Sequence, residues 1–212
     1  MTVPAGALDR AVIPANRYQE RLGAAADAAR RAGLGALLIG VGPDLAYLTG
    51  YRAMPLERLT MLVLVPDRPP AIVVPRLERP AAEAGLQTAI RIAPWDETAD
   101  PYRLVVDLVG GTSRPVGVSD RLWARHLLAL EERLPASFEP ASQVLRDLRM
   151  VKDQDEIELL RLAAEAADRV IASIAAGPLV GRPEADVARE VRDRLVDEGH
   201  DEAAFAIVAS GP

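Results

Sequence analysis

The sequence predicts an α/β protein, in which a mixed, mostly parallel β-sheet with flanking helices is followed by an α+β unit that opens with helices. Short apolar strand patterns alternate with amphipathic helical patterns through the first part of the chain, and such alternation is typical of a sheet covered by helices. Near residue 150 the alternation gives way to long helical patterns. We therefore expect a first domain at residues 1–148 and a second at residues 149–212.

The elements of the first domain follow from apolar spacing and from residues that start and stop helices. Asn16 and Gln19 have the spacing of a capping box, and Gly33 suits the end of that helix. Two apolar runs joined by the proline-rich segment 66–70 predict a hairpin whose strands are buried on both faces. The expected elements are helix 16–33, strand 36–41, a turn at 42–44 leading into 45–51, strands 59–65 and 71–74, a proline-interrupted helix 77–84, strand 89–92, helix 101–109, strand 116–119, helix 121–133 and an edge strand 137–139.

The second domain is expected to begin with a long, well-capped helix. Asp153 and Glu156 form another capping-box spacing, and Gly177 followed by proline ends the run. Pro183 is placed at the first position of the next helix, which Gly199 ends. The expected buried positions are Ile157, Leu160, Ala164, Ala167, Ile171 and Ile174 on the long helix, packed against a sheet, then Val187, Val191 and Leu195, and a core strand at 205–209.

The composition of the chain argues against several classes of function. The 25 basic and 31 acidic residues give a formal net charge of −6, so the chain has no overall positive field for nucleic acid or an anionic membrane. The absence of cysteine excludes a disulfide scaffold, a thiolate zinc site and a cysteine nucleophile within this chain, and favours a cytoplasmic location. Residues 1–15 lack a signal-peptide pattern, and no apolar run approaches the roughly 20 residues of a membrane span. We expect neither export nor membrane insertion.

Familiar catalytic and cofactor signatures are absent from the sequence. Gly40 and Gly42 could begin a dinucleotide fingerprint, but Leu45 occupies the place of its third glycine. No P-loop is present, and the segment around Ser119 lacks the closing glycine of a nucleophile elbow, so this serine is interpreted as a strand-end or helix-cap hydroxyl. The sequence therefore predicts no nucleotide loop and no catalytic serine.

The histidines and the acidic cluster have structural explanations. His126 lies on an amphipathic helix and is expected to contact water or neighbouring side chains, whereas His200 is expected in a loop ahead of the last strand. A lone histidine is no metal site. The carboxylates between Asp153 and Glu158 suit the positive end of a helix dipole rather than a catalytic pair. A buried terminal strand also needs a neighbour for its backbone groups, so we expect the second domain to be incomplete.

Three segments, in order along the chain, resemble the signatures of one enzyme family. Residues 44–51 (DLAYLTGY) resemble the N-x-x-Y-L-T-G-[FY] turn of the creatinase, prolidase and Xaa-Pro aminopeptidase family, with Asp44 where asparagine is commoner. Residues 149–157, which include Lys152, resemble its interdomain signature R-x-x-K-x-x-x-E-[IL]. Residues 205–212 resemble the first strand segment of the family's pita-bread catalytic domain.

The resemblance implies a creatinase-like N-terminal domain followed by the start of a pita-bread domain. In this family two Asp, one His and two Glu bind a pair of manganese, cobalt or zinc ions, and the bridging hydroxide attacks the scissile carbonyl. All of these ligands follow the segment matching residues 209–211, which implies that this chain alone binds no catalytic metal and hydrolyses nothing. Phe205 is the one residue carried over as substrate-binding, because family members often have an aromatic residue on this strand; core packing is its alternative role.

Two further residue roles remain open at this point. The resemblance suggests that loops of the N-terminal domain can reach a partner subunit's active site, but a glycine-ended turn with Tyr47 and Leu48 in the core also explains residues 47–51. We favour that structural explanation. Lys152 is expected to fix the start of the interdomain helix by contacting a carboxylate or a carbonyl.

The chain is therefore interpreted as the N-terminal portion of a cytoplasmic Xaa-Pro aminopeptidase or Xaa-Pro dipeptidase. The resemblance implies a homodimer that acts on proline-containing peptides and binds neither nucleic acid nor membranes. Three alternatives stay open: a creatine amidinohydrolase-like enzyme, a non-catalytic creatinase-like dimerisation or binding module, and a nucleotide-binding doubly wound domain suggested only by the βα alternation.

Overall fold

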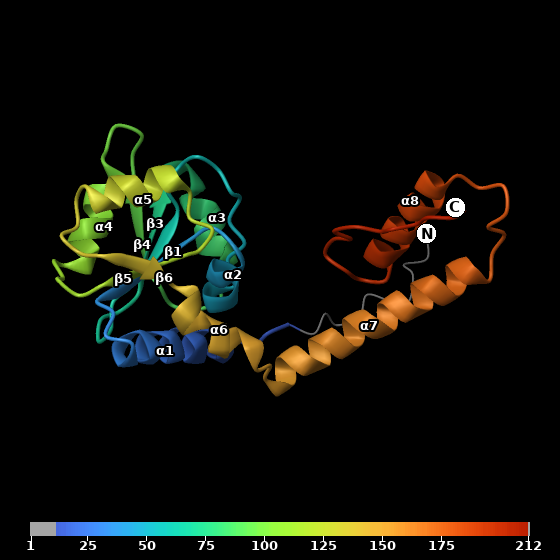
Figure 1. Ribbon diagram of the computed structural model, residues 1–212, viewed down its shortest axis with the longest axis horizontal. Coiled ribbons are helices and arrows are strands. Elements are labelled where there is room, and N and C mark those ends of the chain that lie inside the picture. Colours follow the sequence, from blue (N-terminus) through green and yellow to red (C-terminus); the bar gives the residue numbers. More distant parts are fainter. Residues whose placement is uncertain (1–11, 212) are drawn as a thin grey trace. The chain divides into compact units, whose positions relative to one another are not determined.

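The computed structural model describes residues 12–211, which form two compact units (Figure 1). The first unit is Pro14–Val151, and the second comprises residues 12–13 together with 152–211. The division between the units falls after Val151, and the domain boundary expected from the sequence lies after residue 148. Residues 1–11 and 212, which include most of the segment searched for a signal peptide, lie outside the described residues.

The first unit is built on a six-stranded sheet with the order β4-β3-β2-β1-β5-β6. Strand β2 is antiparallel to both of its neighbours, and the other strands share one direction. This arrangement confirms the predicted mixed, mostly parallel sheet, the β2–β3 hairpin and the edge position of β6. The strands are β1 (Ala36–Gly40), β2 (Met61–Leu64), β3 (Ala71–Pro75), β4 (Arg91–Trp95), β5 (Val116–Val118) and β6 (Phe138–Pro140).

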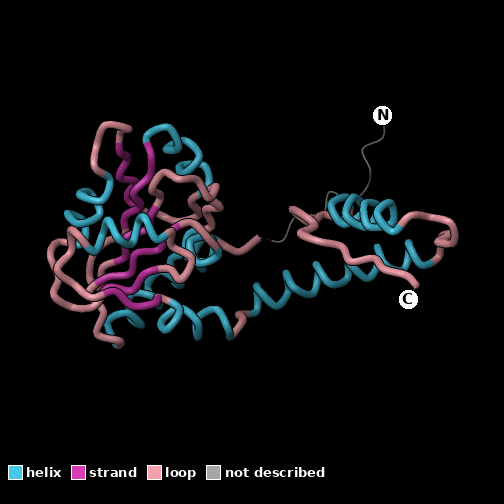
Figure 2. The backbone as a smooth tube through the Cα atoms, turned by 45° about the horizontal axis from the view of Figure 1, so that its top comes forward, coloured by secondary structure: helices cyan, strands magenta, loops and turns pink. Residues whose placement is uncertain are grey.

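Helices cover both faces of this sheet (Figure 2). Alternate residues of β1 point to opposite faces, so Leu37 and Ile39 join one core cluster while Ala36 and Leu38 join the other. The first face is covered by α1 (Ala15–Arg31), α2 (Pro43–Thr49), α3 (Arg79–Gly85) and α6 (Ser142–Met150), and the second by α4 (Pro101–Val109) and α5 (Ala124–Glu131). A 3-10 turn, η1 (Arg76–Glu78), precedes α3.

Several local expectations for the first unit are wrong. Helix α1 begins after Pro14, whose extended backbone makes it the N-cap, and Asn16 lies inside the helix and donates to Glu20 instead of capping. The segment expected as a turn after Gly42 is helix α2, because Pro43 occupies its first turn, where a missing N–H costs nothing. Helix α6 was not anticipated at all.

Two element boundaries also differ from the prediction. Strand β4 lies two to three residues later than expected, because its parallel register with β3 runs from Arg91 to Trp95. Helix α5 begins at Ala124 rather than at Arg121, since Leu122 closes a turn by donating to the Ser119 carbonyl.

The second unit contains α7 (Gln154–Ala175) and α8 (Glu184–Asp197). The capping box of Asp153 and Glu156 is confirmed, with both reciprocal hydrogen bonds at 2.9 Å. The expected seam of α7 is wrong except at Ile174: Ala166, Val170 and Ile174 are the buried residues of the helix. Val170 and Ile174 pack against Val187 and Val191 of α8 rather than against a sheet. Pro183 is the N-cap of α8 rather than its first residue, and Gly199 ends that helix in a positive-φ conformation.

The expected strand at 205–209 is not present in the structure. Residues 202–210 have no regular secondary structure, and Ala206 and Val208 pack against the small core formed by α7 and α8. A strand needs a neighbouring strand for its backbone donors and acceptors, and the described residues of this unit offer none. Within residues 12–211, none of the helices combines the length and apolarity that crossing a bilayer would require.

Candidate functional site

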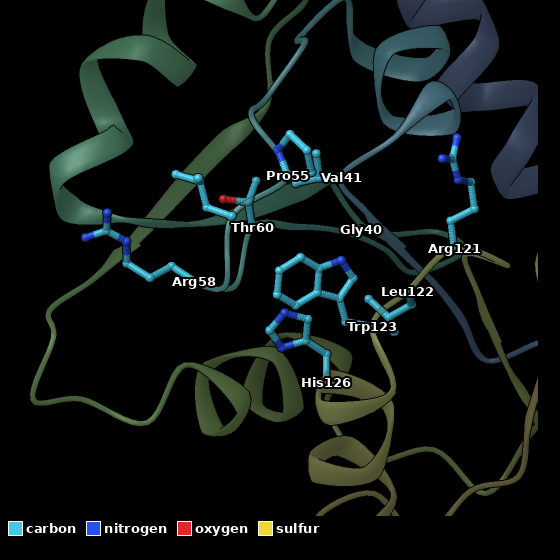
Figure 3. A pocket seen from close by; sticks show the side chains of 10 residues that line it. Gly40, Val41, Pro55, Arg58, Thr60, Arg121, Leu122, Trp123 and His126 are labelled. Atoms are coloured by element: carbon cyan, nitrogen blue, oxygen red, sulfur yellow. The ribbon is translucent and has the colours of Figure 1, made fainter.

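A small hollow, open to solvent, lies at the carboxyl edge of the sheet in the first unit (Figure 3). Strands β1 and β5 are adjacent and parallel, yet the chain leaves β1 for α2 on one face and β5 for α5 on the other. Such a reversal creates a crevice where open α/β sheets bind ligands. The hollow is lined by Gly40, Val41, Pro55, Leu56, Arg58, Thr60, Arg121, Leu122, Trp123 and His126.

His126, in the first turn of α5, forms part of the wall of this hollow. Its side chain is only 5% exposed, and its Nδ1 is 2.9 Å from the Tyr102 hydroxyl. The imidazole stacks on the Trp123 indole, with ring centroids 6.1 Å apart and planes at 17° (Figure 3). Burial lowers the pKa of His126, and the positive charge of Arg125 lowers that pKa further. Burial therefore favours the neutral form of the ring, and the contacts with Tyr102 and Trp123 fix its orientation.

The polar side of the hollow is formed by Arg58 and Thr60. Arg58 donates to Glu97 at 2.8 Å and lies 3.6 Å from the Glu78 carboxylate. Thr60 is within 3.5 Å of the same carboxylate. Acidic partners outside the lining thus neutralise Arg58 and fix its direction. Arg121 lies on the other side of the hollow as an exposed cation.

Ser119 joins the two strands below the hollow. Its hydroxyl accepts the Gly40 backbone N–H at 2.9 Å, and its own N–H donates to the Leu38 carbonyl at 3.1 Å. This geometry confirms the interpretation of Ser119 as a strand-end hydroxyl. It is a structural hydrogen bond that closes the end of the β1–β5 pair.

The lining of this hollow combines an indole and aliphatic side chains with arginine, threonine and imidazole groups. In residues 12–211, no three His, Cys, Asp or Glu side chains are grouped so that they could hold a metal ion. The described residues therefore do not fit the metal pair that the family resemblance implies.

A second polar cluster links two segments that the sequence analysis singled out. The Tyr47 hydroxyl of α2 donates to the Leu148 carbonyl in the last turn of α6 at 2.8 Å. Beside it, Arg149 donates to Asp44 at 2.7 Å. Leu48 is fully buried and Tyr47 is half-buried against the same core, which confirms their expected packing role. The polar contacts to α6 were missed, because residues about a hundred positions apart give no pairing signal in a single sequence.

The other predicted positions lie in the second unit or at its start. Phe205 is 74% exposed and lies in the segment without regular structure, so its substrate-binding role stays a prediction. His200 lies outside α8, as expected for a loop residue, with its Nδ1 3.1 Å from the Leu195 carbonyl. Lys152 lies between α6 and α7.

The sequence analysis did not find the pairing of His126 with Tyr102, since only tertiary packing brings α4 and α5 together.

Comparison with a family model adds an independent observation. Residues 21–151, which lie within the first compact unit, match the Creatinase/Prolidase N-terminal domain. The match covers both signature-bearing helices of the polar cluster, α2 and α6.

Known proteins resemble the chain over both units. The probable dipeptidase PepE of Mycobacterium tuberculosis is 45% identical over 197 residues, which cover 92% of this chain and 52% of that protein. The crystal structure of dipeptidase PepE from Mycobacterium ulcerans superposes with a TM-score of 0.81 at 41% identity, covering 91% of this chain and 53% of that one. The crystal structure of a recombinant prolidase from Thermococcus sibiricus superposes with a TM-score of 0.80 at 25% identity, covering 89% of this chain and 52% of that one. The chain thus spans about half the length of the curated relatives it matches.

Proposed function

Because the chain belongs to the creatinase/prolidase family, we propose that it is the N-terminal portion of a metal-dependent peptidase that hydrolyses Xaa-Pro bonds, as an aminopeptidase or a dipeptidase. The observation that carries this proposal is the 45% identity to a probable dipeptidase over 92% of the chain. That similarity extends past the family-matched residues into the second unit. The likeness to a structure described as a prolidase supports the preference for proline.

The chemistry and the partners of the complete protein are part of the same proposal. A pair of divalent ions, manganese, cobalt or zinc, would supply the activated water and would hold the developing oxyanion. Residues 12–211 do not fit such a pair, so the ligands would be side chains outside this range. We further propose a cytoplasmic homodimer that takes proline-containing peptides as substrates, with Phe205 near the substrate.

The deciding experiment combines mass and activity on one sample. The protein is purified from its source, its intact mass is measured, and hydrolysis of Ala-Pro is assayed after chelation and after return of each metal. Ala-Ala and Pro-Ala serve as matched peptides that lack proline in the second position. A mass well above 22.7 kDa with metal-restored cleavage of Ala-Pro supports the proposal.

Two other outcomes would replace the proposal. Hydrolysis of creatine without cleavage of Ala-Pro would identify a creatine amidinohydrolase-like enzyme. A mass of 22.7 kDa with no hydrolysis and with self-association would identify a non-catalytic dimerisation or binding module.

A further inference from the structure

The first unit fixes its own final helical turn with three side chains from α1 and α2. We propose that Arg21, Asp44 and Tyr47 are positioning residues, which we call the α6 clasp, and that they hold the last turn of α6 at the point where the first unit ends. Helix α6 ends at Met150 and the unit ends at Val151. The kinetic consequence of this idea rests on the proposed peptidase function, but the structural part does not.

The end of α6 needs an external partner for its carbonyl groups. The last four carbonyls of a helix have no intrahelical donor, and the residue that follows α6, Val151, is extended rather than a left-handed glycine. The Tyr47 hydroxyl donates to one of these carbonyls, that of Leu148, at 2.8 Å. Packing alone would not require this hydroxyl, because a phenylalanine ring would fill the same volume.

The ion pair of Asp44 with Arg149 is a second contact between α2 and the last turn of α6. The distance from Arg149 Nη1 to Asp44 Oδ1 is 2.7 Å, and the Asp44 side chain is only 20% exposed. Asp44 is in the first turn of α2, and Arg149 is in the last turn of α6. Each charge therefore also complements its own helix dipole, and the two effects favour the same geometry.

Arg21 of α1 contacts both the ring and the backbone of Tyr47. Its guanidinium lies 4.3 Å from the centroid of the Tyr47 ring, and its Nη1 donates to the Tyr47 carbonyl at 3.1 Å. The Tyr18 ring flanks the same guanidinium at 5.4 Å. Arg21 is 8% exposed, and a buried cation on a ring face interacts more strongly than an exposed one. Tyr47 therefore has little freedom to release Leu148.

These contacts give the two signature-like segments a common role. Asp44 and Tyr47 come from the segment DLAYLTGY, and Arg149 opens the segment that contains Lys152. The first segment restrains the residue that begins the second. The clasp thereby defines where the chain leaves the first unit.

The test uses the complete protein with charge reversals and their combination. Asp44→Arg and Arg149→Asp each place like charges together, and the double variant restores an opposite pair. Tyr47→Phe removes only the hydroxyl, and Asp44→Asn keeps an acceptor for Arg149. Asp107→Arg is the matched control, because it disrupts the exposed ion pair with Arg103 on α4, away from α6.

Local hydrogen exchange is the primary measurement. Each single reversal and Tyr47→Phe should speed amide exchange at residues 148–151 by about fivefold, the scale expected for one well-oriented pair or hydrogen bond. The denaturation midpoint reported by Trp95 and Trp123 should stay close to that of the parent protein. The double reversal should restore part of the protection, because it re-forms an opposite pair but places each charge against its helix dipole. Asp44→Asn should give a smaller increase in exchange than the reversals, and Asp107→Arg should leave the protection nearly unchanged. Unchanged exchange in the single variants, or no recovery in the double variant, would overturn the clasp.

Kinetics separate this inference from the proposed function. In an active peptidase, loss of the clasp should raise KM for Ala-Pro about threefold or more while kcat stays within about twofold, since ground-state binding rather than chemistry is disturbed. An unchanged KM alongside faster exchange would overturn the positioning role. If no peptidase activity exists but exchange responds as expected, the clasp stands and the proposed function fails.

Discussion

The two units of the chain differ sharply in how much apolar surface they bury. Around the six-stranded sheet, seventeen buried residues form one core cluster and thirteen form the other. The second unit has a cluster of four buried residues, Val170, Ile174, Val187 and Val191. Burial of apolar area is the main favourable term in folding. The first unit therefore has the core of an autonomous domain, whereas α7 and α8 hold together through one narrow contact.

Exposed large apolar residues occur in both units, among them Met54, Leu77 and Leu128 in the first, but they make up a larger share of the second. Helix α7 leaves Ile157, Leu160 and Ile171 about half exposed, and the segment after α8 leaves Phe205 and Ile207 largely exposed. In the first unit the strands β1, β2 and β3 are buried along their whole length. Both units have regular apolar patterns in their sequence. Only in the first unit do these patterns build a large packed core; in the second they form helices with a small one.

The largest expected effect of this difference is on hydrogen exchange. In the 212-residue chain, amides of α8 such as Val191 should exchange about a thousandfold faster than those of β1 such as Ile39, because local opening of a small core costs several kcal/mol less than opening a central strand. Exchange measured by mass spectrometry with peptide resolution tests this. Equal protection of α8 and β1 would mean that the second unit is stabilised as strongly as the first.

A cavity in the first unit should have the next largest effect. Leu38→Ala, at a fully buried position in β1, should lower the free energy of unfolding by about 3 kcal/mol through lost transfer energy and an unfilled cavity. Leu160→Ala on α7 is the control, and its exposed site should change stability by less than about 0.5 kcal/mol. Both tryptophans, Trp95 and Trp123, lie in the first unit, so urea denaturation followed by fluorescence reports that unit. A loss below about 1 kcal/mol for Leu38→Ala would contradict the packed core.

The sequence predicted the sheet well, because strong patterns and local geometry agree there. Apolar runs near proline or glycine located β1, β2, β3 and β5 closely, and the expected helix 101–109 coincides with α4. In the structure the Asp100 side chain is the N-cap of α4 and accepts from the backbone of Tyr102 and Arg103. The short helix α2 was missed because Gly42 and Pro43 also fit a turn. In α7 the many alanines allow several apolar stripes, and only the position of α8 selects the one through Val170.

The candidate site was much less predictable than the sheet. The hollow unites residues from Gly40 to His126 that meet only through the order β1–β5 and the loops at one edge of the sheet. His126 was placed on its helix, but its Tyr102 partner lies on another element. The α6 clasp likewise depends on tertiary pairing of α2 with α6. A single sequence contains the side chains of such sites but not their distances.

Removing the α7 cap should have a moderate effect confined to the second unit. Asp153→Ala deletes the acceptor for the Glu156 N–H and should destabilise the first turn of α7 by about 1 kcal/mol. Amide exchange at residues 154–158 should rise about fivefold, as that energy implies, with the tryptophan-reported unfolding of the first unit unchanged. Asp168→Ala, at an exposed position inside the same helix, is the control. A loss of first-unit stability on Asp153→Ala would show that the units are energetically coupled.

The smallest expected effect is a pH dependence that belongs to the first unit and arises at His126. Burial, and after it the charge of Arg125, lowers the pKa of His126 below its ordinary value, which is about 6.5, so that beneath this value the folded state binds fewer protons than the unfolded state. The stability contributed by the neutral ring is therefore fully present above pH of about 6.5 and declines as the pH falls towards the folded-state pKa.

An NMR titration of the His126 ring gives that pKa directly, and tryptophan-detected urea denaturation at pH values above and below this range gives the stability change. His126→Gln should remove the part of the pH dependence due to this ring, while His200→Gln, in the second unit, should leave it in place. A His126 ring that titrates at or above its ordinary pKa would mean that water reaches it more freely than its packing against Trp123 and Tyr102 implies. The contrast in burial between the first unit and the second would then be smaller than the structure indicates.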